Sequence, residues 1–167
     1  QAQTVVKIRA SDDSIVGSIG IADPLGLAYD GTNIWVANNS PNATMVKISG
    51  ASGPPTVLST LFVGASFGAF IAFDGTNIWA NYNGTLVRLR ISDNAFLPQI
   101  GVGFSRGGLV FDGVHMWVSG ESNLIKLRAS DGSQVGSFPV LNLGAAAAFD
   151  GANIWVANSG SGKVGKY

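Results

Sequence analysis

Three charged side chains stand outside the repeating pattern of this sequence and are its candidate binding residues: Asp23, Arg106 and Glu121. Two carboxylates and one guanidinium on a common surface could bind a glycan or a protein. Nearly all of the other acidic and basic residues recur at equivalent positions of an internal repeat, which indicates roles in turns and strands. Whether the three form a site therefore depends on how the repeat places them.

The sequence gives little support for an enzymatic role. The single histidine, His115, replaces an asparagine of the other repeats (Asn33, Asn77, Asn153) beside a turn, so we interpret it as a turn or strand-edge residue. The serines lie in loops and turns, and no Ser-His-Asp set can be assembled from them. Without cysteine there is neither a disulfide nor a thiolate metal site. The sequence predicts no catalytic residue, no metal site and no cofactor.

The repeat is carried by one phrase that contains all four tryptophans: YDGTNIWVAN, FDGTNIWAN, FDGVHMWVSG and FDGANIWVAN. The tryptophans, separated by 44, 38 and 38 residues, are Trp35, Trp79, Trp117 and Trp155. Short β-segments at a period near 40 predict a β-propeller. Because each tryptophan occupies the same strand position, we expect all four to be buried in the core between blades.

Each repeat predicts four antiparallel strands, named A to D from the hub to the rim. Strand A is rich in small residues, and the four segments are Gly26–Tyr29, Ala69–Phe73, Gly107–Phe111 and Ala145–Phe149. Asp-Gly pairs then predict hairpin turns, because glycine accepts a positive φ; the pairs are Asp30-Gly31, Asp74-Gly75, Asp112-Gly113 and Asp150-Gly151. Strand B carries the tryptophan, and strand C alternates apolar and basic residues. Strand D contains Pro98 and Pro139, which places it at the edge of the blade.

We therefore expect one all-β domain over residues 1–167, a β-propeller with four blades of four antiparallel strands. The repeats span about 4–43, 44–84, 85–122 and 123–162, and a fifth starts at 163. Five C strands compete for four places; they start at Thr4, Thr44, Thr85, Asn123 and Lys163. The N-terminal strands are expected to complete the last blade, within one chain or from a neighbouring chain. Exchange between chains would produce a ring or a head-to-tail fibre.

One face of this disc collects the unassigned residues. In an A-B-C-D meander the B–C and D–A loops share a face, which places Asp23, Arg106 and Glu121 together and His115 on the opposite face. The three Asn-x-Ser/Thr sequons, possible glycosylation sites, lie on the same loop face: Asn38, Asn42 and Asn83. This loop face is the predicted location of any ligand site.

The phrase FDGxNIWVANxxxxxVxKI resembles bacterial extracellular propellers of the NHL-repeat and virginiamycin B lyase class, over essentially the whole chain. The resemblance implies a propeller and a secreted protein, although these relatives usually have six or seven blades. It also implies, for the lyases, histidine and glutamate acting with a magnesium ion. The single His115 offers no visible counterpart of that apparatus.

The composition of the chain indicates which partners and which location to expect. Only 12% of the residues are charged and the net charge is zero, so a nucleic-acid groove is not expected. No apolar run reaches the roughly 18 to 20 residues of a membrane helix. The start Gln1-Ala2-Gln3 resembles the remnant of signal-peptide cleavage, which favours an extracellular or periplasmic location. Near-zero charge gives little repulsion between copies.

We therefore expect a non-enzymatic secreted scaffold whose partner is itself. Two alternatives stay open. One is a glycan- or protein-binding module that uses the loop face. The other is a metal-dependent lyase or hydrolase of the virginiamycin B lyase type.

Overall fold

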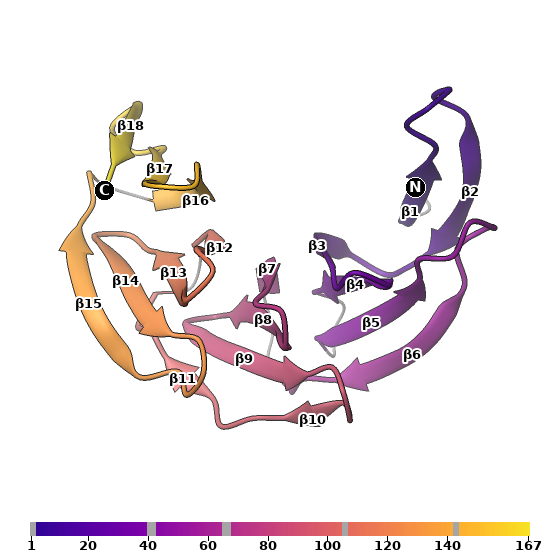
Figure 1. Cartoon of the computed structure of the whole chain (residues 1–167), viewed down its shortest axis with the longest axis horizontal. Helices are drawn as coiled ribbons and strands as arrows, with labels where there is room; N and C mark the ends of the chain where they lie inside the picture. Colours follow the sequence, from indigo (N-terminus) through magenta and orange to yellow (C-terminus); the bar gives the residue numbers. More distant parts are fainter. Residues whose placement is uncertain (1–2, 40–42, 65–67, 105–106, 142–143) are drawn as a thin grey trace.

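The structure is a computed structural model that describes residues 3–39, 43–64, 68–104, 107–141 and 144–167, and within these ranges every regular element is a β-strand. The sheets are small and antiparallel, and Figure 1 shows them side by side along an arc, with the first strand of each blade at the inside and the last at the rim. The all-β propeller with four blades that the sequence predicts is confirmed.

Each blade follows chain order from the hub outward. Blade 1 contains β3 (Pro24–Tyr29), β4 (Asn33–Asn38), β5 (Thr44–Ser49) and β6 (Val57–Phe62). Blade 2 contains β7 (Gly68–Phe73), β8 (Asn77–Tyr82), β9 (Thr85–Arg90) and two short pieces, β10 (Ala95–Phe96) and β11 (Ile100–Gly101). Blade 3 contains β12 (Leu109–Phe111), β13 (His115–Ser119), β14 (Asn123–Arg128) and β15 (Gln134–Pro139). Blade 4 has three strands, β16 (Gly144–Phe149), β17 (Ile154–Asn158) and β18 (Lys163–Lys166).

Proline shapes the outer strands as expected. In blade 2 the single D strand predicted from the sequence is divided into β10 and β11, which both pair with β9 on either side of Pro98. Proline has no N–H to donate to the ladder, so the strand is interrupted there. Pro139 is the last residue of β15, which lies at the edge of its sheet.

The N-terminal residues form a separate two-stranded sheet of β1 (Thr4–Ile8) and β2 (Ile15–Gly20). Its register shifts between Lys7 and Ile8, as the C–D pairs of blades 1 and 3 shift at the equivalent position. The hairpin therefore has the geometry of strands C and D. Val5, Ile19 and Ile21 pack it against Val36 and Val46 of blade 1, where a preceding blade would lie.

The ring is not closed within the chain. Figure 1 shows β1 and β2 on one side of the opening and β16 to β18 on the other. Among the described residues, β1 pairs with β2 alone and β17 pairs with β16 and β18. The N-terminal residues form strands over Thr4–Ile8 and Ile15–Gly20. Of the two closures expected from the sequence, however, the one within a single chain is not formed.

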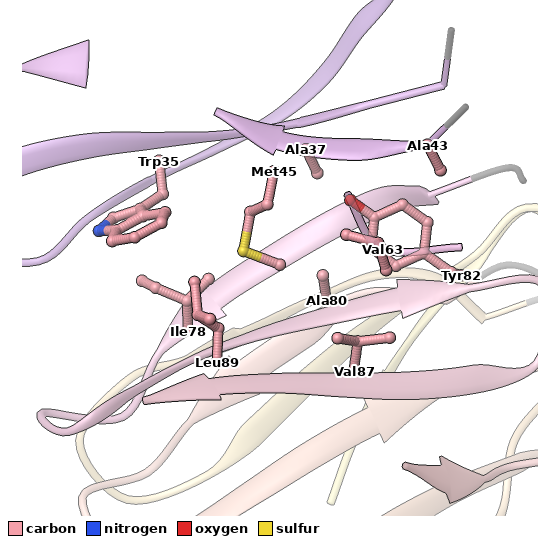
Figure 2. Packing of buried hydrophobic residues seen from close by; sticks show 10 residues of the cluster. All are labelled: Trp35, Ala37, Ala43, Met45, Val63, Ile78, Ala80, Tyr82, Val87 and Leu89. Atoms are coloured by element: carbon pink, nitrogen blue, oxygen red, sulfur yellow. The ribbon is translucent and has the colours of Figure 1, made fainter. Parts of the chain in front are cut away.

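The core consists of apolar layers between neighbouring blades. Figure 2 shows the layer between blades 1 and 2, in which Trp35 and Met45 of blade 1 face Ile78 and Leu89 of blade 2. Trp35 and Trp79 are fully buried in such layers. A layer of this kind needs a blade on both sides. The position of a blade in the arc therefore decides how well its tryptophan is covered.

The fourth tryptophan corrects the sequence-based expectation. Trp117 is 9% exposed, whereas Trp155 is 38% exposed. Trp155 belongs to blade 4, which has no following blade within the chain. The repeat predicts the strand position of Trp155 correctly, but its burial also requires a following blade to cover it.

Candidate functional site

Every blade holds its tryptophan through the same two contacts. The indole N–H donates to Oδ2 of the aspartate five residues earlier, at 2.6 to 2.7 Å. A basic side chain of strand C lies over the indole ring, 4.8 to 5.4 Å from its centroid. The sets are Asp30, Trp35 and Lys47; Asp74, Trp79 and Arg88; Asp112, Trp117 and Lys126; and Asp150, Trp155 and Lys166.

Sequence reasoning assigned these aspartates to turns and these bases to strand C, and it missed both contacts with the indole. The signals were present: the Asp-to-Trp spacing is constant, and the base recurs opposite the tryptophan in the strand register. A cation over an aromatic face is worth about 0.5–2 kcal/mol, depending on its exposure. The repeated charges therefore belong to the architecture of the blade.

Hydrogen bonding lowers the pKa of three of these turn carboxylates, Asp30, Asp112 and Asp150. For Asp30 and Asp112, partial burial acts to raise the pKa, but the backbone N–H donors and the indole together outweigh it. For Asp150, the indole of Trp155 is the largest cause of the lowered pKa, followed by two backbone N–H groups. These three carboxylates are thus held ionised as acceptors, a state suited to a structural role.

The described residues form two unfilled apolar surfaces, one at each end of the arc. The C-terminal end face is defined here by Trp155 and Val164. Val164 lies opposite Ala157 in the register, as Met45 lies opposite Ala37 in blade 1. Met45 is fully buried beside the tryptophan of its own blade, whereas Val164 is 66% exposed. The C-terminal end face therefore has the composition of an interblade layer without its cover.

The N-terminal end face is defined here by Leu25, Leu27 and Tyr29 of β3, all of them exposed. By register, Leu27 and Tyr29 correspond to Ile71 and Phe73 in blade 2. Those two side chains pack against the layer that contains the tryptophan of blade 1. In the complete blades, this position of strand A thus meets the tryptophan of the preceding blade.

A cavity lies between the N-terminal hairpin and blade 1. Its volume is about 350 Å³, and apolar side chains dominate the lining, among them Val5, Leu27, Tyr29, Ile34 and Ile48. A smaller space of about 200 Å³ continues between β1 and the start of β3. The hairpin supplies only strands C and D, so the cavity lies on the hub side of β1, where strands A and B of a complete blade would lie.

The predicted loop-face residues are placed as follows. Asp23 lies in the β2–β3 loop at φ 49°, and its N–H donates to Oε1 of Gln3. Glu121 is exposed in the β13–β14 loop, two blades further along the arc. Arg106 lies outside the described residues. His115 starts β13, at the end of that strand away from Glu121, and its Nδ1 lies 3.4 Å from Oδ2 of Asp112.

The asparagines of the predicted glycosylation sites differ in their exposure. Asn38 is 4% exposed, and its Oδ1 accepts hydrogen bonds from the N–H and the hydroxyl of Thr44. This burial argues against its prediction as a glycosylation site, because glycosylated asparagines lie at the surface. Asn83 is exposed in the β8–β9 turn at φ 47° and stays a prediction. Asn42 lies outside the described residues.

Two kinds of feature are absent from the residues that the structure describes. They contain no group of three or more His, Cys, Asp or Glu side chains that could hold a metal ion. None of them forms a helix of the length and apolarity needed to cross a membrane.

The arc of small antiparallel sheets defines the chain as a β-propeller. No protein-family model matches it, and no match was found among curated proteins. Among solved structures it is similar to the computationally designed Ika4 protein, with a TM-score of 0.76 and 13% identity over 91% of this chain and 96% of that one. It is also similar to BamB from Moraxella catarrhalis, with a TM-score of 0.70 and 14% identity over 97% of this chain and 54% of that one.

A chain of the Nidogen/Laminin complex is likewise similar, with a TM-score of 0.74 and 13% identity over 100% of this chain and 71% of that one. The chain thus spans about half the length of BamB and nearly all of Ika4. At identities this low the similarity shows the fold alone.

Proposed function

We propose that this protein is a non-enzymatic, secreted β-propeller that acts as an extracellular scaffold by joining copies of itself head to tail. The observation that carries the proposal is the pair of unfilled end faces. Trp155 is exposed at one end, and Leu27 and Tyr29 are exposed at the other.

The two end faces match each other as halves of one interface. Between blades 1 and 2, Trp35 shares a layer with Ile71 and Phe73. Trp155 corresponds to Trp35. Leu27 and Tyr29 correspond to Ile71 and Phe73. Exposed apolar surfaces of this kind mark interaction sites. Because the two faces differ, the contact is heterologous and produces a closed ring or an open fibre, according to whether the rotation closes.

Secretion is supported by the low charge, the absence of cysteine and the resemblance to extracellular propellers of the NHL-repeat and virginiamycin B lyase class. A chain of the same fold in the Nidogen/Laminin complex supports a role in protein binding. The scaffold role rests on the end faces, since the charged candidates Asp23 and Glu121 lie in loops of different blades.

The test is the mass of the protein in solution, measured by light scattering over a range of concentrations. Trp155→Asp and Leu27→Asp each remove one end face, and either variant alone should be monomeric. An equimolar mixture of the two should form a dimer and nothing larger, because each supplies the face that the other lacks.

A matched control is Leu58→Asp, since Leu58 is also an exposed leucine but lies on the outer strand β6. This variant should assemble as the original chain does. A wild-type chain that stays monomeric at every concentration would contradict the proposal. Failure of the mixture to form a dimer would show that the two faces do not bind each other.

A further inference from the structure

Strand β18 is a poor strand C by the standard of the other blades. At the position opposite Val156, β18 has Gly165. The equivalent residues of blades 1, 2 and 3 are Val46, Val87 and Ile125, each of them buried in an interblade layer. β18 is also shorter than these strands, and within the chain it has no strand D beside it.

Strand β1 has what β18 lacks. Its register against β2 places Val6 at the position of Val46, and Ile8 at the position of Ile48. Val46 and Ile48 are buried, whereas Val6 is 48% exposed and Ile8 is 60% exposed. The side chains of a core strand are thus present in β1, and they lack the preceding blade that would cover them, as the hairpin covers Val46 and Ile48.

Lys7 is the basic residue of β1, and it also lacks its usual partner. In each of the four blades the base at this position lies over a tryptophan ring. The Lys7 ammonium instead donates to the backbone carbonyls of Ala51 and Gly53, in the C–D turn of blade 1. No tryptophan is within its own sheet, which consists of β1 and β2 alone.

The two partial sheets are complementary in strands as well as in side chains. The hairpin β1–β2 has strands C and D and lacks A and B. The sheet β16–β17–β18 has A, B and C and lacks D. Joining β16 and β17 of one copy to β1 and β2 of another makes one complete blade, with β18 as the surplus strand.

We propose that β18 is a placeholder, and that β1 of a second copy displaces it from β17 when copies of the chain join. This inference rests on the proposed head-to-tail assembly and names the strand that enters. In the joined blade Lys7 lies over Trp155 of the other copy, and Val6 takes the place beside Gly165 that the Tyr167 ring fills in the free chain. Tyr167 follows β18 and packs against the layer between blades 3 and 4. When β18 is displaced, Tyr167 moves out of this layer and Ile8 takes its position.

The exchange conserves backbone hydrogen bonds, because β17 loses one antiparallel partner and gains another. β2 keeps its pairing with β1 throughout, so the driving force is the burial of Val6 and Ile8, set against the loss of the partly buried Tyr167 from its layer. β18 covers the open edge of β17 in the free chain, and this limits unwanted pairing of that edge. Assembly is reduced by the fraction of chains in which β18 occupies the edge.

The first experiment removes the placeholder by ending the chain after Gly162. The truncated chain should associate more tightly than the full chain, by roughly tenfold or more in apparent Kd, because its binding-competent fraction rises. Light scattering gives the association, and far-ultraviolet circular dichroism checks that the blades persist. Weaker association of a folded truncated chain would overturn the inference.

The second experiment keeps the full chain and needs no truncation. Ala37 lies opposite Met45 in blade 1, so Val5 should lie opposite Ala157 of the other copy. The chain has no native cysteine. A Val5→Cys chain mixed with an Ala157→Cys chain should therefore form a disulfide-linked heterodimer under mild oxidation. Ile8→Cys mixed with Ala157→Cys is the control, because three residues out of register the sulfurs lie too far apart.

The outcomes separate the two proposals. Association without the Val5–Ala157 cross-link would mean that the end faces dock with β18 in place, which overturns the exchange and leaves the scaffold standing. No association in any chain, truncated or full-length, would overturn both. A cross-link in the predicted pair, absent from the control pair, supports both.

Discussion

The indole N–H of Trp155 donates to Oδ2 of Asp150 at 2.7 Å, the same contact that the buried tryptophans make, although Trp155 is 38% exposed. The contact lies within one hairpin and does not require a neighbouring blade. The side chain at the end of the arc is therefore held ready in the orientation that the interior tryptophans adopt. A surface preorganised in this way loses little conformational entropy when it is covered.

The first prediction compares a buried and an exposed tryptophan. Trp79→Ala should lower the free energy of unfolding by about 3–5 kcal/mol, because it empties a closed interblade layer. Trp155→Ala should lower it by only about 1–2 kcal/mol in the monomer, since the residue is partly in contact with water already. Urea unfolding at a concentration where the protein is monomeric measures both, and equal losses would contradict the role of the end face.

The second prediction concerns acid. Hydrogen bonds lower the pKa of Asp150, chiefly from the indole of Trp155, and that of Asp131 to about 2, chiefly from the backbone N–H of Ser133. In the unfolded chain both groups titrate near pH ~3.9. Their folded pKa values are depressed, so their contribution is complete above about pH 4 and is lost as the pH falls through the folded values. Urea midpoints should therefore fall between about pH 4 and pH 2.

An Asp131→Asn, Asp150→Asn double variant provides the comparison for that prediction. Its midpoint should be lower at neutral pH, and its decline between about pH 4 and pH 2 should be shallower than that of the original chain. A decline of unchanged steepness would show that other carboxylates cause the acid sensitivity.

The third prediction concerns the close approach of blades 3 and 4 at the hub. A Cβ added at Gly108 would lie 2.6 Å from the backbone nitrogen of Ala147, and neither backbone can move independently of its sheet. Gly108→Ala should therefore destabilise the fold by several kcal/mol. Gly20→Ala is the matched control, because no atom lies within 4 Å of the added carbon. Equal melting temperatures for the two variants would contradict this account of the hub.

Local chemistry explains why so much of the fold could be predicted from the sequence. The Asp-Gly pairs fix the A–B turns, and Gly31, Gly75, Gly113 and Gly151 all adopt the positive φ that such turns require. The alternation of apolar residues in strand C sets the register, and Pro98 and Pro139 mark the rim. These features depend on neighbours within one repeat, and the repeat displays them four times.

The end faces could not be predicted in the same way, because burial depends on the neighbouring blade. Trp35 and Trp155 have nearly identical sequence surroundings, yet one is fully buried and the other is 38% exposed. Asn38 reads as an exposed sequon in a loop but accepts two hydrogen bonds from Thr44 in the core. The surplus of C strands was the one sequence signal that pointed to the ends of the arc.

The last prediction separates folding from assembly at the N-terminal hairpin. Deleting residues 1–20 removes Val5 and Ile19, which pack on Val36 and Val46 of blade 1. The free energy of unfolding should fall, but by less than the roughly 1.5–3 kcal/mol that full burial gives each aliphatic side chain, because Val5 and Ile19 are partly buried. Assembly should be lost with it.

A Val6→Ser, Ile8→Ser variant is the matched comparison, because both side chains are exposed in the free chain and neither belongs to the cluster on blade 1. Its monomer should lose much less stability than the deletion variant, whereas its association should weaken by at least an order of magnitude. Full association of the double variant would mean that β1 does not enter the interface. A deletion variant that keeps both its stability and its mass would show that the hairpin has neither role.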